Sequence, residues 1–167
     1  ALCSKFSFTI PHTVVVGGKT RFHSVKNGLK KVDGDGVTAI HDGVRPLTSV
    51  ELIRKCFREA RKETNAVPCL PSSESVRIIK EEFSKTLNRN SVVLIQTPQC
   101  FQTNLIKAAY NFAYKAVFTD DASVLENNVD CFDQYSTLIN LVEGEKENIK
   151  ITTEKDLIFA EALLRRK

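Results

Sequence analysis

The sequence predicts a three-layer α/β domain built on a doubly wound, mostly parallel sheet. Short β-branched runs alternate along the chain with segments whose apolar residues recur at helical spacing. That alternation is typical of βαβ units and a parallel sheet. The length of 167 residues is that of one domain with a substantial core. We therefore treat residues 1–167 as a single domain.

The first βα unit is expected around two adjacent glycines. Thr13–Val16 is a β-branched run that predicts a strand ending at Gly17 and Gly18. From Arg21 the apolar residues follow a helical period, so a helix is expected to about Lys31. Glycines at this junction allow a close backbone approach, although an ordinary tight turn explains the same pair.

The central strand is predicted at Val37–Ile40, after a turn at residues 33–36, and is expected to be buried on both faces. It ends at His41 and Asp42. In open α/β sheets ligands bind at the carboxyl ends of strands. Asp42 there would hold a divalent metal on a phosphate or accept hydrogen bonds from a sugar hydroxyl. Capping of the next turn is the structural alternative.

The later elements continue the alternation. Thr48 or Ser49 can cap a helix whose apolar face carries Leu52, Ile53, Cys56, Phe57 and Ala60. Apolar runs predict strands at 66–70, 92–96 and 138–142, and a helix at 103–114. Residues 119–123 open a short helix in which capping explains both Asp120 and Asp121. An extended segment at 148–152 precedes a last helix, capped by Thr153 and Asp156, in which Leu157, Ala160 and Leu164 recur at helical spacing.

Residues 73–89 interrupt this rhythm. Ser75–Lys80 and Lys85–Arg89 alternate like two strands of a hairpin, joined by residues 81–84. A lone hairpin is marginal in water because it has little core of its own. We expect a protruding β-arm that packs on a second copy of the chain; folding back on its own sheet is the alternative.

Composition bounds the class of protein. The net charge of +4 comes from lysines and arginines scattered among acids, which favours a solvated surface over a nucleic-acid face. No run is long and apolar enough for a membrane span. Five dispersed cysteines without a CxxC pair argue against a disulfide framework or a zinc site. A reduced, cytoplasmic environment is the simplest interpretation.

Polar residues at the predicted strand ends indicate a site for phosphate and sugar. They are neutral hydroxyls, one carboxylate and a few cations: Ser24 beside Gly17 and Gly18, Asp42 with Arg45, Thr97, and Lys150. The three histidines lie beside no candidate nucleophile, and the sequence contains neither GxSxG nor a Walker loop. A hydrolase with a covalent intermediate is therefore disfavoured.

Five motifs, in order along nearly the whole chain, resemble the 2-C-methyl-D-erythritol 4-phosphate cytidylyltransferase family. They are Gly17-Gly18-x-x-Arg21-x-x-Ser24, His41-Asp42-Gly43-Val44-Arg45-Pro46, Thr97-Pro98-Gln99-x-Phe101, Thr119-Asp120-Asp121-Ala122-Ser123 and Asn148-Ile149-Lys150-Ile151-Thr152. The resemblance implies a Rossmann-like nucleotidyltransferase fold. It also implies attack by the 4-phosphate of methylerythritol phosphate on the α-phosphorus of CTP, with Mg²⁺, in a homodimer joined through the β-arm.

The resemblance also implies a role for individual residues. Cytidine contacts fall on Gly17, Gly18 and Ser24, and the ribose, phosphate and metal side falls on Asp42, Gly43 and Arg45. Lys150 would position the methylerythritol phosphate, with hydroxyl contacts from Thr97 and Thr119. At the arm, Arg89 would reach the partner's substrate, and Ser75 stands where the family commonly has threonine. The structural alternatives are a surface lysine at Lys150, a surface ion pair at Arg89 and a turn residue at Thr97.

The chain also departs from the family pattern. The family's first strand, its glycine-rich loop with an arginine and its Pro-Lys-Gln element have no counterpart in these residues, and Lys19 stands where an acid is common. Two other interpretations remain open. One is a ribitol-5-phosphate cytidylyltransferase of the same fold, and the other is a non-catalytic binding protein.

Overall fold

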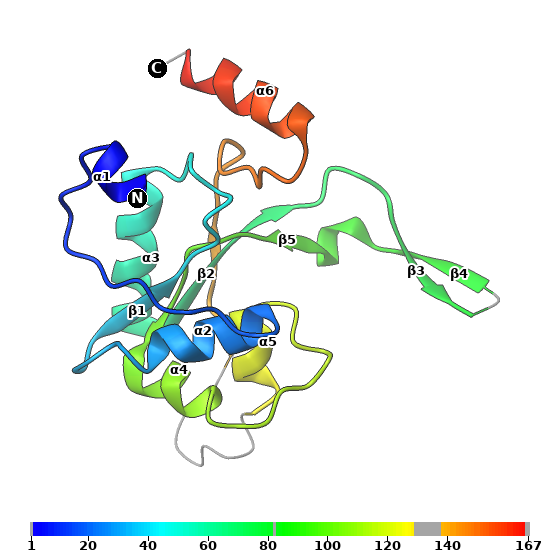
Figure 1. Ribbon diagram of the computed structural model, residues 1–167. Helices are drawn as coiled ribbons and strands as arrows, with labels where there is room; N and C mark the ends of the chain where they lie inside the picture. Colours follow the sequence, from blue (N-terminus) through cyan, green and yellow to red (C-terminus); the bar gives the residue numbers. More distant parts are fainter. Residues whose placement is uncertain (1, 82, 129–137, 166–167) are drawn as a thin grey trace.

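The computed structural model describes residues 2–81, 83–128 and 138–165. A five-stranded sheet stands between helices on both of its faces, and a hairpin projects from one side (Figure 1). The sheet contains β1 (Val37–Ile40), β2 (Asn65–Pro71), β5 (Val93–Ile95), β6 (Gln99–Gln102) and β7 (Leu141–Glu143). The predicted three-layer α/β class is confirmed.

The direction of the strands differs from the prediction of a mostly parallel sheet. β6 lies between β1 and β2 and runs antiparallel to both, and β5 is also antiparallel to β2. Only β7 pairs in parallel with β2 among the described ladders. The chain returns along β2 after the arm, and this return makes β5 and β6 antiparallel. β6 was not predicted, because Thr97-Pro98-Gln99 has the chemistry of a turn.

Two expectations about strands were wrong. Thr13–Val16 forms no ladder, and the side chains of Val14 and Val16 are 86% and 85% exposed. No strand of the described chain lies beside this run, and β-branched composition alone does not form a ladder. Val37–Ile40 is a strand as predicted, but its residues are half-buried because only β6 pairs with it in the described part.

One face of the sheet is covered by α3 (Val50–Glu63). Ser49 caps this helix by accepting a hydrogen bond from the backbone N–H of Leu52 at 2.9 Å. Of the side chains predicted for its inner face, Leu52, Cys56 and Ala60 enter a core with the strands, and Phe57 packs against it; the strands contribute Ala66, Cys100 and Val142. The prediction is wrong for Ile53, which is 37% exposed. This core fixes the helix that follows the Asp42 loop.

The opposite face is covered by α2 (Arg21–Leu29), α4 (Thr103–Ala109) and α5 (Asp121–Glu126). These helices share a second core with the sheet, built around Phe22, Val67, Phe101, Ile106, Tyr110 and Leu125. The helix predicted to reach Tyr114 ends at Ala109, and Tyr110 stacks on Phe22 with ring centroids 4.8 Å apart. The short α1 (Leu2–Lys5) precedes these layers.

The last helix, α6 (Glu154–Leu164), lies at the edge of the molecule (Figure 1). Its predicted capping box of Thr153 and Asp156 is present. Of the three residues at helical spacing only Ala160 is buried, whereas Leu157 and Leu164 are 51% and 56% exposed. No layer of the described chain covers them.

The predicted arm is a hairpin of β3 (Val76–Lys80) and β4 (Phe83–Leu87). Its strands pair only with each other among the described residues, so the alternative of folding back on the sheet is wrong. The hairpin extends away from both cores (Figure 1), and Ile79 and Phe83 are 80% and 61% exposed. The turn η1 (Arg89–Ser91) connects it to β5. None of the helices described is long and apolar enough to cross a bilayer.

Candidate active site

Three cations surround the carboxylate of Asp42, directly after β1. Arg21 Nε lies 3.2 Å from Oδ1, whereas Lys150 Nζ lies 3.1 Å and Arg45 Nε 3.9 Å from Oδ2. The Asp42 side chain is 14% exposed. The cations come from α2, from the loop after β1 and from the segment before α6, so the fold brings together residues distant in sequence.

Main-chain hydrogen bonds hold the two segments that carry Arg45 and Lys150. Arg45 Nη1 donates to the carbonyl oxygen of Asn148 at 2.7 Å. The backbone N–H of Ile151 donates to the carbonyl oxygen of Val44 at 2.8 Å. The loop after β1 is thereby joined to residues 148–151, and Lys150 is placed over Asp42.

The charges of the cluster shift the acidity of its members. Burial would raise the pKa of Asp42, but the hydrogen bond from Lys150 and the charges of Arg21 and Lys150 outweigh it and hold that pKa below its ordinary value. Burial lowers the pKa of Arg45, against the opposing charge of Asp42. Nε of Arg45 is a buried donor without a hydrogen-bond partner in the described residues.

Thr97 is buried and positions the main chain of Asp42. Its Oγ1 accepts from the backbone N–H of Asp42 at 3.1 Å and lies 2.9 Å from Nδ1 of His41. Nε2 of His41 lies 3.0 Å from the carbonyl oxygen of Arg45, which can only accept. In the neutral ring Nε2 therefore donates, and Nδ1 accepts the proton of Thr97. One lone pair of the Thr97 hydroxyl is left for a further donor.

The paired glycines pack closely against the first turn of α2. The backbone N–H of Gly18 donates to Ser24 Oγ at 2.9 Å, and that hydroxyl donates to the carbonyl oxygen of Thr20 at 3.1 Å. A Cβ on Gly18 would clash with His23. The expected close backbone approach therefore exists, and it brings Gly17, Gly18 and Ser24 together.

Of the remaining predicted site residues, Ser75, Arg89 and Thr119 have no contact with Asp42 in the described ranges, and Gly43 directly follows it. Arg89 and Ser75 are exposed at the base of the arm, and no contact joins them to the Asp42 cluster within the described ranges. Gly43 is exposed in the turn after Asp42. Thr119 is exposed, and its backbone N–H donates to Ser123 Oγ at 3.0 Å, which belongs to the start of α5.

Arg21 and Asp121 were missed as parts of the site. Arg21 donates from Nη1 and Nη2 to the two oxygens of Asp121 at 2.9 and 2.7 Å. The interpretation that capping explains both aspartates holds only for Asp120, whose side chain accepts from the backbone N–H of Ser123. Asp121 is fully buried and pairs with Arg21. The sequence feature that could have indicated Arg21 is its position three residues after Gly18, at the start of the predicted helix.

The residues present set limits on a metal site. Within the described ranges no group of three or more His, Cys, Asp or Glu side chains converges to hold an ion. Proteins often bind Mg²⁺ through one or two carboxylates together with substrate phosphates. Asp42 fits that pattern as a single protein ligand, although both of its oxygens already accept hydrogen bonds from cations.

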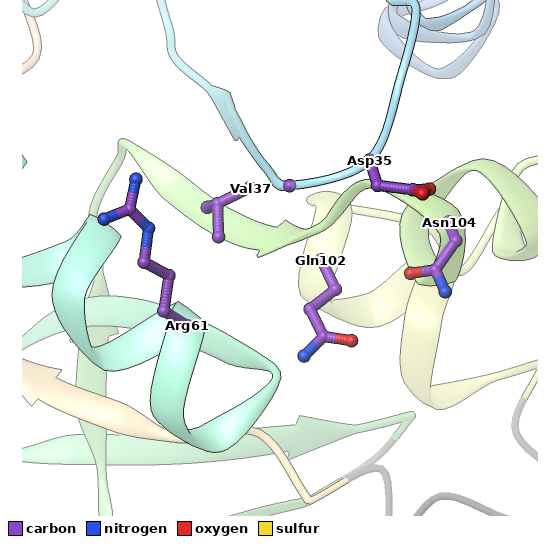
Figure 2. A pocket seen from close by; sticks show the side chains of 6 residues that line it. Asp35, Val37, Arg61, Gln102 and Asn104 are labelled. Atoms are coloured by element: carbon purple, nitrogen blue, oxygen red, sulfur yellow. The ribbon is translucent and has the colours of Figure 1, made fainter.

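A separate polar pocket lies at the other end of β1 (Figure 2). Its volume is about 310 Å³, and its lining comes from the turn before β1, α3, β6 and the start of α4. Asp35, Val37, Arg61, Gln102 and Asn104 line it. None of the predicted site residues belongs to this pocket, so we place the candidate site at Asp42.

The fold and the site together are those of an α/β nucleotidyltransferase. The carboxylate of Asp42 follows the end of β1 and lies among cations that are suited to binding phosphate groups. The model of the family described as 2-C-methyl-D-erythritol 4-phosphate cytidylyltransferase matches residues 3–166. The chain belongs to this family.

Individual relatives agree with this assignment. A protein of Bacteroides fragilis named 2-C-methyl-D-erythritol 4-phosphate cytidylyltransferase is 48% identical over 163 residues, which are 98% of this chain and 71% of that protein. A protein of the same name from Phocaeicola vulgatus is 44% identical over the same shares. The crystal structure of the enzyme of that name from Thermus thermophilus superposes with a TM-score of 0.77 at 31% identity, covering 95% of this chain and 78% of that one.

Proposed function

We propose that this protein joins CTP and 2-C-methyl-D-erythritol 4-phosphate to give 4-diphosphocytidyl-2-C-methyl-D-erythritol and pyrophosphate, in the synthesis of isoprenoid precursors. Membership of the family supports this reaction. The structural observation that carries it is the group of three cations around Asp42 at the end of β1.

The chemistry needs positioning and charge compensation more than proton transfer. A phosphate oxygen is already a nucleophile at neutral pH. It forms a bond to the α-phosphorus of CTP while the bond to the β-phosphate oxygen breaks, and pyrophosphate leaves with that electron pair. The protein must hold two anions together and offset their repulsion, as in other phosphoryl transfers.

The cations of the site divide this work. Lys150 is 48% exposed and bonds only to Asp42 among the described contacts, so it can turn toward the incoming phosphate. Arg45 is 11% exposed and is fixed on the carbonyl oxygen of Asn148. We assign the cytidine side to Gly17, Gly18 and Ser24, with Gly43 beside the ribose and phosphates. Thr97 and Thr119 are assigned to hydroxyls of the second substrate.

Asp42 would hold Mg²⁺ together with the phosphate oxygens of the nucleotide. When bound, this ion neutralises charge on the triphosphate. The donor set supports a single protein carboxylate, because Asp121, the other carboxylate that Arg21 binds, is held by Arg21 and Tyr110.

The homodimer is part of the proposal. The arm exposes apolar side chains at Ile79 and Phe83, and burial against a partner would remove them from water. A two-fold dimer is the commonest closed assembly. Arg89 and Ser75 at the base of the arm would then complete the partner's site. A cytoplasmic location agrees with the free thiols of Cys3, Cys56, Cys69 and Cys100; Cys131 lies outside the described residues.

Turnover by the full-length protein tests the proposal. With CTP and 2-C-methyl-D-erythritol 4-phosphate we expect pyrophosphate and the cytidylyl product, and far less product with ribitol 5-phosphate. Asp42→Asn should lose about 2–4 kcal/mol of transition-state stabilisation, as for the loss of one strong electrostatic contact. Asp33→Asn, at an exposed turn, is the matched control. Preference for ribitol 5-phosphate, or full activity of Asp42→Asn, would contradict the assignment.

A further inference from the structure

The guanidinium of Arg21 uses all three of its nitrogens on two carboxylates. Nη1 and Nη2 bind the two oxygens of Asp121 at 2.9 and 2.7 Å, and Nε binds Oδ1 of Asp42 at 3.2 Å. Planar arginine is suited to such a fork, whereas a lysine ammonium reaches one point. Arg21 therefore connects the buried Asp121 to Asp42, which follows the end of β1.

The inner end of this link is rigid. Asp121 is fully buried at the start of α5, and Tyr110 donates from its hydroxyl to Oδ1 of Asp121 at 2.6 Å. Tyr110 is 1% exposed and stacks on Phe22, which belongs to the same helix as Arg21. A buried carboxylate that is paired and hydrogen-bonded on both oxygens is costly to displace.

At the other end of this link, the two oxygens of Asp42 have different partners. Oδ1 of Asp42 is bound by Arg21, while Oδ2 is bound by Lys150, the more exposed of the two cations, at 48% against 36%. In the proposed function Lys150 turns to substrate. The Nε of Arg45 remains 3.9 Å from Oδ2, and the shorter contact of Arg21 at 3.2 Å then holds the carboxylate in place.

We propose that Arg21, fixed by Asp121 and Tyr110, is a positioning residue that holds Asp42 by one oxygen and leaves the other oxygen for exchange. This inference rests on the proposed function for its effect on rate. Removal of the Tyr110 hydroxyl should loosen Arg21 without touching substrate, and the loss should reach catalysis only through Asp42.

The experiment is a double-mutant cycle in the full-length protein. Tyr110→Phe, which keeps the stacked ring, should lower kcat roughly tenfold, the effect of one hydrogen bond to a charged group. Its KM for CTP should change little. In an Asp42→Asn background the same change should alter kcat less than about twofold, because coupled residues are not additive. Tyr114→Phe, in the same aromatic cluster and 42% exposed, is the control.

Arg21→Lys adds a readout that does not depend on activity. Lysine keeps the charge but cannot bind both carboxylates, so kcat should fall about a hundredfold, as for a misplaced catalytic group. Crystal structures of the wild type and of Arg21→Lys, both without substrate, should show the Asp42 carboxylate displaced in the variant, because the Nε bond to Oδ1 is lost. Wild-type kcat in Tyr110→Phe, or an equal loss in both backgrounds, would overturn the inference. If the wild type makes no cytidylyl product, the proposed function fails. An Asp42 carboxylate that keeps its position in the Arg21→Lys structure would reject the positioning role separately.

Discussion

At the scale of single residues, Arg45 and Lys150 differ although both face Oδ2 of Asp42. Arg45 is mostly buried and anchored on Asn148, whereas Lys150 is half-exposed and held only by its ion pair. An exposed ion pair contributes about 0–1 kcal/mol to stability. The structural contribution of Lys150 is therefore small, which agrees with the proposed role of this residue in binding substrate.

Lys150→Ala should lower kcat/KM about a hundredfold, because a cation between two anionic substrates stabilises mainly the transition state. The melting temperature should change by no more than a few degrees, since about 1 kcal/mol of surface ion pair is lost. Steady-state kinetics and thermal unfolding of the same preparation measure both. Lys146→Ala, at an exposed position of the same segment, is the control. A destabilised variant with an unchanged rate would make Lys150 structural.

Sequence reasoning predicted three members of the Asp42 cluster and missed Arg21, which joins that cluster to Asp121. Asp42, Arg45 and Lys150 were predicted from their place in motifs, and the fold brings them into contact. The partner of Arg21 lies 100 residues away, and no local pattern indicates that pairing. Asp121 stands beside the capping Asp120, so a local explanation sufficed for a side chain whose partner is distant.

At the scale of elements, α6 begins with a dense set of hydrogen bonds to one carboxylate. Asp156 accepts from the backbone N–H and the hydroxyl of both Thr152 and Thr153. These bonds favour the ionised form and lower the pKa of Asp156 to about 2 from 3.8. The stabilising contribution is therefore complete above pH 3.8 and is lost as the pH falls through about 2.

Asp156→Asn should destabilise α6 at neutral pH and lose that effect in acid. We expect the helical signals of residues 154–164 to weaken in the variant at pH 7, and wild type and variant to converge toward pH 2. NMR titration of the carboxyl carbons measures the pKa of Asp156, and Glu154→Gln in the same first turn is the control. A pKa near 3.8, or a difference that does not depend on pH, would contradict this account.

Helices and strands were predicted correctly where the local sequence pattern favoured the element and another element of the fold packs or pairs with it. Thr13–Val16 is β-branched throughout and Val37–Ile40 at all positions but Ala39, yet only Val37–Ile40 lies beside another described strand. α3 was predicted together with its N-terminal cap, because the Ser49 cap and the helical spacing of the apolar residues are both visible within the same short stretch of sequence. The antiparallel β6 follows directly after a Thr-Pro turn, and its pairing with β1 and β2 depends on residues far along the chain.

At the scale of the whole molecule, two cores lie on opposite faces of the sheet and the arm belongs to neither. The arm's strands are hydrogen-bonded to each other, yet their side chains are mostly exposed. A hairpin of this kind gains stability chiefly from a partner surface. The proposed dimer would supply that surface and would place Arg89 at a second site.

Complementation between two impaired variants tests the shared site. Arg89→Ala and Lys150→Ala subunits should each lose about a hundredfold in kcat/KM when assayed alone. Mixed dimers should recover part of the activity, because one of their two sites then contains both intact residues. Mass spectrometry of the mixture verifies exchange, and each variant mixed with itself is the control. A monomer in solution with normal turnover, or no recovery despite exchange, would refute the arrangement.

The ion pairs of Asp42 also bear on the design of inhibitors. A basic amine aimed at this carboxylate would have to displace Arg21 or Lys150, both already within 3.2 Å of it. Its affinity would be reduced by the contact it breaks. An acidic or neutral head group directed at the buried Nε of Arg45 would instead meet a donor without a hydrogen-bond partner in the described residues. Compounds built on that donor would leave the ion pairs of Arg21 and Lys150 in place and would compete only with the longer contact, 3.9 Å, between Arg45 and Asp42.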